Sequence, residues 1–283
     1  MVTVNELNKA GLGTYQQNIE RGIWEDTGKT CPTHNAPIYL SHYPKHLDGL
    51  ELCIGCGWDN IRQRAKDTAA ESESQSVLAR GYQVFFNESI LSKEVAKVSF
   101  ANFEVKNQTD QEALNYGKRL ARDYVKGMKG NAVLKGPTGV GKSHLSMAIA
   151  KQINETFKNY NQARTVIFVS VAKLMQLLKD NFDKKDSKYS QERMTKLLTE
   201  CDYLILDDLG KESTTGNSVR STGDWKYSFL FNILDNRETT IINTNFSVKE
   251  LQKIYDNAFV SRVLKGAKNN ILSYPDDATD KRF

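Results

Sequence analysis

Eight consecutive residues, from Gly136 to Ser143, have the types and spacing of a loop that binds a polyphosphate. They match the pattern G-x-x-x-x-G-K-[ST] at every defined position. Glycines let the backbone turn its N–H groups toward phosphate oxygens at the positive end of a helix. Lys142 would supply a cation for the β- and γ-phosphates, and the Ser143 hydroxyl would be a ligand of Mg²⁺. The loop therefore predicts a site for ATP and Mg²⁺.

The elements around this loop have the order that such a site needs. Residues 132–134 are typical of a short buried strand, and residues 144–159 of a helix with one apolar face. This order disfavours the alternative, which is a glycine-rich turn that precedes a helix by chance. The residues expected to line the nucleotide are Gly136, Pro137, Thr138, Gly139, Val140, Gly141, Lys142, Ser143 and His144.

Two carboxylates follow a second hydrophobic run. The segment 203–206 predicts a buried strand, and Asp207 and Asp208 come directly after it. The carboxyl ends of parallel strands share one edge of a sheet, so both side chains should lie beside the phosphate loop. Asp207 would hold the water shell of the Mg²⁺ ion, and Asp208 would polarise a water molecule for attack on the γ-phosphate.

An amide ends a third apolar run. Residues 240–244 predict another buried strand, and Asn245 stands at its carboxyl end, where its amide could orient the attacking water. The alternative is that Asn245 is simply a turn residue at a strand end.

Three of the four cysteines lie close together near the N-terminus, in the pairs Cys31–His34 and Cys53–Cys56. In a cytoplasmic protein this spacing indicates a metal rather than disulfides. Four such ligands close a tetrahedral site and leave no open position for chemistry, so we interpret them as a structural zinc site. His42 or His46 could replace His34, and reduced thiols without a metal are the remaining alternative. Cys201 is expected to play no part in metal binding.

The composition is that of an ordinary soluble protein, and no apolar run is long enough to span a membrane. Residues 1–6 lack the features of a signal peptide, so we expect a cytoplasmic protein with no membrane partner. Residues 1–60 carry 4 basic and 7 acidic side chains, a net −3, whereas residues 99–283 carry 29 and 22, a net +7. The acidic segment favours a protein partner, and the basic one gives weak support for a nucleic-acid partner.

The chain is expected to divide into a zinc-binding domain at 1–60, a linker at 61–98 and a nucleotide-binding domain at 99–283. Residues 71–76 are polar and turn-prone. The aromatic residues Tyr39, Tyr43 and Trp58 are expected in the small core of the first domain, and the alternative is that they stack on bases.

With these residues in place, the chain resembles the AAA+ ATPases, and more closely the bacterial and phage loaders of the replicative helicase, of the DnaC/DnaI type. The similarity rests on the Leu-Asp-Asp-Leu-Gly segment that ends at Gly210, the 225–237 helix before Asn245, and the pair Ser261-Arg262. The resemblance implies an α/β fold, a P-loop NTPase with a parallel five-stranded sheet, preceded here by a small zinc-binding domain.

The resemblance also implies roles for individual residues. Asp208 would be the catalytic base, although many AAA+ proteins have Glu there, and Asn245 would be the sensor of the γ-phosphate. Arg262 would be a finger that acts on the ATP of a neighbouring subunit, unless it is an ordinary surface charge or helix cap. Arg282 is the only late candidate for a second sensor.

We therefore expect an ATP-hydrolysing helicase loader whose partners are a hexameric replicative helicase, single-stranded DNA and further copies of the chain. A transposition helper ATPase, which resembles loaders but usually lacks a zinc segment, is the alternative. A DNA- or protein-binding adaptor whose nucleotide site only regulates assembly is a third hypothesis, which a turnover assay would separate from an active ATPase.

Overall fold

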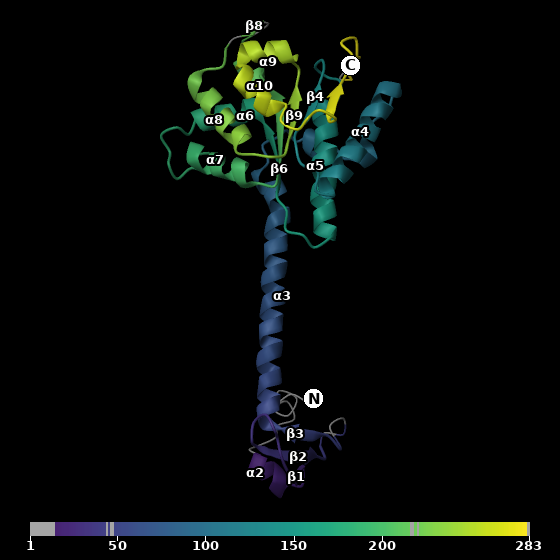
Figure 1. Ribbon diagram of the computed structural model, residues 1–283, viewed down its shortest axis with the longest axis vertical. Helices are drawn as coiled ribbons and strands as arrows, with labels where there is room; N and C mark the ends of the chain where they lie inside the picture. Colours follow the sequence, from purple (N-terminus) through teal and green to yellow (C-terminus); the bar gives the residue numbers. More distant parts are fainter. Residues whose placement is uncertain (1–14, 44, 46–47, 216–217, 220, 282–283) are drawn as a thin grey trace. The chain divides into compact units, whose positions relative to one another are not determined.

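The computed structural model describes residues 15–43, 45, 48–215, 218–219 and 221–281 (Figure 1). The chain divides into two compact units, residues 1–76 and 77–283. The division into 1–60, 61–98 and 99–283 stays a prediction. No helix among the described residues is long and apolar enough to cross a membrane.

The N-terminal unit is built on a small antiparallel sheet. Its strands lie in the order β1-β2-β3. Among the residues of this unit that the structure describes, the elements are α2 (Tyr15–Glu20), β1 (Trp24–Thr30), β2 (Pro37–Ser41) and β3 (Glu51–Cys53). Trp24, Tyr39 and Leu52 form its core, and the first two rings stack at 5.7 Å. Tyr39 is buried as predicted, but Tyr43 is 51% exposed and Trp58 is 46% exposed, so the expected place of these two in the core is wrong.

A long helix, α3 (Ile54–Glu88), begins in the N-terminal unit and ends in the second one. The turn expected at residues 71–76 is wrong, because this segment is helical throughout. The physical reason is composition, since Ala, Glu, Gln and Arg are strong helix formers and no proline interrupts them.

The second unit has a five-stranded parallel sheet in the order β10-β4-β9-β6-β5, which confirms the predicted fold. Its strands are β4 (Ala132–Lys135), β5 (Val166–Ser170), β6 (Tyr203–Leu209), β9 (Thr240–Thr244) and β10 (Ile271–Ser273). A two-residue pair, β7 (Thr214–Thr215) and β8 (Ser218–Val219), lies outside this sheet. Since β9 lies between β4 and β6, the residues that end these three strands meet at one edge.

Helices cover both faces of this sheet (Figure 1). Alternate strand residues supply the two cores: Ile167 and Val169 of β5 face one side, and Val166 and Phe168 the other. The first face is covered by α6 (Val171–Lys179), α7 (Gln191–Glu200), α8 (Asp224–Asp235) and α10 (Asn257–Val263). The second face is covered by α4 (Gln108–Val125) and α5 (Lys142–Asn159). The remaining helix, α9 (Val248–Ile254), packs with α10.

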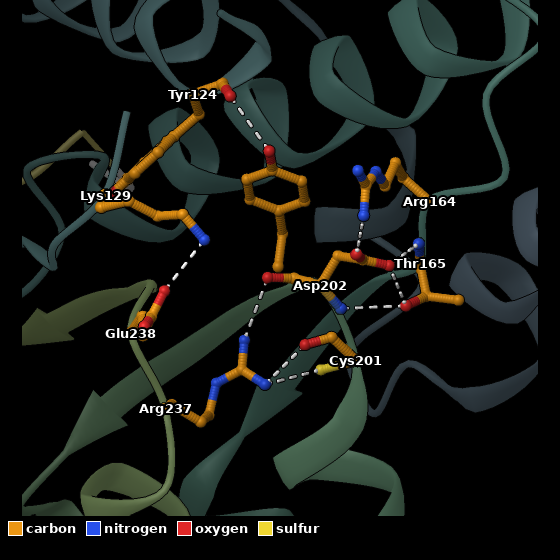
Figure 2. Close-up of polar contacts among 9 residues, drawn as sticks. Tyr124, Lys129, Arg164, Thr165, Cys201, Asp202, Arg237 and Glu238 are labelled. Atoms are coloured by element: carbon orange, nitrogen blue, oxygen red, sulfur yellow. Dashed lines mark hydrogen bonds and ion pairs between the residues drawn. The ribbon is translucent and has the colours of Figure 1, made fainter. Parts of the chain in front are cut away.

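The buried side chain of Arg237 forms hydrogen bonds with the segments that lead into the sheet at the amino ends of its strands (Figure 2). Arg237 is 5% exposed, and its guanidinium donates to the carbonyls of Leu198 at 2.8 Å, Cys201 at 2.6 Å and Thr239 at 2.9 Å. Cys201 is buried in the second unit, outside the described cluster of cysteines and histidine, and burial raises the pKa of its thiol to about 11. That it plays no part in metal binding stays a prediction.

We predict that Arg237→Ala lowers the free energy of unfolding of this unit by about 2–4 kcal/mol, because several buried carbonyls lose their donor. Urea unfolding followed by circular dichroism measures it. Arg164→Ala is the control, since Arg164 pairs with Asp202 at 2.8 Å but is 52% exposed, and an exposed pair contributes about 1 kcal/mol or less. Equal losses in the two variants would contradict this account of Arg237.

Candidate functional site

A cavity of about 260 Å³ lies where the phosphate loop passes from β4 into α5. Six of the residues predicted to line a nucleotide border it: Thr138, Gly139, Gly141, Lys142, Ser143 and His144. Gly136, Pro137 and Val140 belong to the loop but not to the cavity wall. Gly139 has φ +83°, a backbone conformation that other residues rarely adopt, so a larger residue there would be strained.

Lys142 is the cation of the loop. It is 5% exposed, and its Nζ donates to the carbonyl oxygens of Gly136 at 2.8 Å and Pro137 at 2.6 Å. Its ammonium is therefore held at the loop, where a bound polyphosphate would compete with these carbonyls for its protons.

The hydroxyl and carboxylate predicted to serve Mg²⁺ are in contact. Ser143 Oγ donates to Asp207 Oδ1 at 2.8 Å, and Asn243 Nδ2 donates to the same oxygen at 2.7 Å. Burial raises the pKa of the Asp207 carboxyl, and the neighbouring Asp208 raises it further, while these two hydrogen bonds oppose the shift. A hydroxyl and a carboxylate are hard oxygen ligands, so this pair fits Mg²⁺.

Asn243 is a site residue that the sequence analysis missed. Its side chain is fully buried and also donates to Ser146 Oγ at 2.7 Å, so it fixes Asp207 relative to α5. An asparagine inside the predicted buried strand 240–244 was the available signal, because a buried amide needs a polar partner.

Asp208 lines the cavity in an unusual backbone conformation. Its φ is +60°, at an irregularity in the pairing of β6 with β9 between Leu206 and Leu209. Asp is one of the few residues that adopt this region at small cost. Oδ2 of Asp208 pairs with Lys211 Nζ at 3.0 Å.

Asn245 also lines the cavity, directly after β9. Its Nδ2 donates to Thr138 Oγ1 at 3.2 Å, across from the phosphate loop. Its Oδ1 is buried and accepts no hydrogen bond from the part of the chain that the structure describes. An unpaired buried acceptor at the cavity wall can accept a hydrogen bond from a water molecule there.

Arg262 is absent from the wall of this cavity as the structure describes it. It lies on α10, where its Nε pairs with Asp235 Oδ1 at 2.7 Å and its guanidinium lies over the Phe231 ring at 5.5 Å. The side chain is 37% exposed. The structure therefore does not bring Arg262 to the nucleotide site of its own chain. Arg282 lies outside the described residues.

The N-terminal unit holds the four predicted metal ligands in one cluster, Cys31, His34, Cys53 and Cys56. Zinc–sulfur bonds of about 2.3 Å in a tetrahedron place two sulfurs about 3.8 Å apart and a sulfur and a ring nitrogen about 3.6 Å apart. The Sγ atoms of Cys31 and Cys56 lie 3.7 Å apart, and His34 Nδ1 lies 3.6, 3.8 and 3.4 Å from the three sulfurs. The donor set and its spacing fit zinc.

His34 is also oriented from its far side. Its Nε2 lies 2.8 Å from Asp59 Oδ2, a carboxylate–imidazole contact of the kind that holds metal-bound histidines. Gly55 makes room for the ring, since a Cβ there would lie 2.5 Å from it. His42 lies outside the cluster and contacts Glu25 at 3.2 Å, and His46 lies outside the described residues.

A sequence model described as IstB-like ATP binding protein matches residues 70–265, more than half of the chain. The chain belongs to the IstB-like ATP-binding family. The match begins beyond the zinc-type cluster and includes the phosphate loop, Asp207, Asp208, Asn245 and Arg262. No curated protein matches this IstB-like chain.

Solved structures show the fold of this IstB-like protein. DnaI is 21% identical with a TM-score of 0.50, and the match covers 65% of this chain and 95% of DnaI. The replication initiator DnaA, bound to AMPPCP and single-stranded DNA, is 17% identical with a TM-score of 0.50, over 67% of this chain and 52% of DnaA. The DnaC helicase loader is 23% identical with a TM-score of 0.49, over 65% and 100%. Family and fold together identify an ATPase of the AAA+ class.

The sequence analysis also missed a second residue of the nucleotide cavity. Lys281 lines the nucleotide cavity, its backbone N–H donates to the Gly139 carbonyl at 3.1 Å, and its Nζ pairs at 2.5 Å with Asp110, which is 2% exposed. No local pattern marks Lys281, because its place depends on β10 joining the edge of the sheet beside β4.

Proposed function

We propose that this IstB-like ATPase loads a hexameric replicative helicase onto single-stranded DNA. The observation that carries the proposal is the Cys₃His cluster, which gives the N-terminal unit a means of folding with a very small core. Loaders and transposition helpers share the ATPase fold, but helpers usually lack a zinc segment. An additional metal-stabilised unit therefore favours the loader. The net −3 charge of residues 1–60 favours a protein as the partner of this unit.

The chemistry is hydrolysis of the β–γ bond of ATP. The loop N–H groups and Lys142 bind the phosphates, and Ser143 and Asp207 would hold Mg²⁺. When bound, the ion offsets negative charge on the phosphates. Asp208 polarises the attacking water and accepts a proton from it. The Oδ1 of Asn245, which has no partner among the described residues, orients that water.

Self-association would complete the site. Arg262 is anchored on its own chain by Asp235 and is partly exposed, so its guanidinium can be presented to a neighbouring subunit. An inserted arginine stabilises the charge that develops on the γ-phosphate. Hydrolysis would then depend on assembly of several ATPase units.

A transposition helper is the second candidate. The observation that favours it is the family match itself, since the model that covers residues 70–265 is the IstB-like one. Only the N-terminal unit, which lies largely outside this match, favours the loader over the helper.

The proposal is tested by capture of purified hexameric replicative helicases on the immobilised, zinc-loaded full chain. We expect a stable complex that survives Lys142→Ala, which removes the phosphate-binding cation, but is lost when the cluster is broken by Cys56→Ser. A chain that captures a transposase and no replicative helicase would contradict the loader and support the helper.

We predict that Asp208→Asn binds ATP with wild-type affinity but hydrolyses it about 10²- to 10⁴-fold more slowly, since the group that accepts the proton is gone. Asn tolerates the φ of +60° at this position, so the backbone should be kept. Fluorescent-nucleotide binding and steady-state phosphate release measure the two effects. Lys142→Ala, the contrasting variant, should lose affinity instead. Wild-type turnover by Asp208→Asn would overturn the assignment of the base.

A further inference from the structure

A groove of about 770 Å³ runs between α4 and the C-terminal half of α5, and it shares no lining residue with the nucleotide cavity. The two helices lie side by side on one face of the sheet (Figure 1). Residues of α4 form one wall, and Gln152 and Thr156 of α5 with the following Tyr160 form the other. Ala121 and Val125 give it an apolar floor.

Three cations line one wall of this groove: Lys118 and Arg122 of α4, and Lys126 directly after the helix ends. They are spaced four residues apart, so they form a row along one side of the helix with steps of about 6 Å. All three are exposed, and none of the described residues that line the groove carries a carboxylate. The nearby Asp123 is paired with Arg119 at 3.1 Å. The row is therefore a strip of positive charge without an acidic counterpart in the groove.

An aromatic ring stands at the opposite wall. Tyr160 is 63% exposed, more than any other large hydrophobic side chain in the described part of the chain. It follows the end of α5 and has no role in either core of this unit. Exposed aromatic rings beside a strip of cations are the arrangement by which proteins hold unpaired nucleotides, with phosphates on the cations and a base stacked on the ring.

We infer that this groove binds single-stranded nucleic acid, with the backbone along Lys118, Arg122 and Lys126 and a base on Tyr160. The inference rests on the proposed function for its DNA partner and assigns that partner a surface. A single strand fits better than a duplex, because only an unpaired base offers its face to a ring. Since the groove and the nucleotide cavity are separate, DNA and ATP can be bound together.

The test is fluorescence anisotropy of a labelled oligo(dT) with the full chain, ATP and Mg²⁺ over a range of salt concentrations. Each phosphate contact contributes about 0.7 to the slope of log K against log salt, so the triple change of the three cations to Ala should flatten the slope by about 2. Tyr160→Ala should weaken binding about tenfold, whereas Tyr160→Phe, which keeps the stacking face, should bind as wild type.

Lys196→Ala is the matched control, because Lys196 is an exposed cation on α7, away from this groove, and its loss should leave the slope unchanged. Unchanged ATP affinity in every variant shows that the unit is folded. An unaltered salt slope in the triple variant would overturn the inference while leaving helicase capture, and so the proposed function, intact. The inference would also be overturned if the wild type did not bind oligo(dT). The same holds if the triple variant lost helicase capture but kept DNA binding.

Discussion

Cys53→Ser protein should contain no stoichiometric zinc, and its N-terminal unit should be unfolded. The expected effect is the largest in this protein, because binding of a structural zinc contributes about 10–16 kcal/mol to the folding of a small domain. Among the described residues of this unit, the buried apolar core is Trp24, Tyr39 and Leu52, which is too little to replace the metal. Elemental analysis measures the zinc, and the fluorescence of Trp24 and Trp58 reports the unfolding of this unit.

The ATPase unit supplies the internal control. ATP binding by Cys53→Ser should be unchanged, since the nucleotide cavity is built from residues of the second unit alone. Cys201→Ser, at a buried thiol outside the cluster, should keep its zinc. Full zinc content in the Cys53→Ser protein would show that the ligand set is wrong.

Arg262→Ala should bind ATP normally and hydrolyse it about 10³-fold or more slowly, the size of effect seen when an arginine finger is removed. The affinity should hold because Arg262 does not touch the cavity of its own chain. Phosphate release at saturating ATP measures the loss. Arg119→Ala is a matched control, because Arg119 is also a partly exposed arginine with a single carboxylate partner on its own chain, Asp123.

A mixture of Arg262→Ala with Lys142→Ala distinguishes action between subunits from action within one. The Lys142→Ala chain keeps its finger but lacks a working site, so an assembled pair should regain part of the activity. No such recovery is possible if Arg262 acts only within its own chain. Mixtures that co-assemble and remain inactive would contradict the role between subunits.

The parts of the site that the sequence predicted are those carried by local patterns. The phosphate loop, the strand that carries Asp207 and the Cys–His pairs can each be recognised from a few neighbouring residues; the strand itself is longer than predicted and continues to Leu209. The order of strands and loops then brings Ser143 within 2.8 Å of Asp207, as expected for residues at the carboxyl edge of a parallel sheet. The roles assigned to Asp208, Asn245 and Arg262 stay predictions.

The parts that could not be predicted depend on contacts between distant segments. The strand β10 is three residues long, and it forms because it pairs with β4. Lys281 reaches the phosphate loop only because that strand returns the chain to it. The turn predicted at residues 71–76 was wrong because serine and glutamate are found both in turns and in exposed helices such as α3.

The most direct test of the loader function is helicase loading onto circular single-stranded DNA coated with single-strand-binding protein. With the captured helicase, the wild-type chain and ATP, we expect stable helicase–DNA complexes after removal of free protein. Lys142→Ala and the zinc-free Cys53→Ser protein should both fail to load the helicase. The first should not bind nucleotide, and the second should not bind the helicase. Equal amounts of helicase on the DNA with and without the wild-type chain would contradict the account.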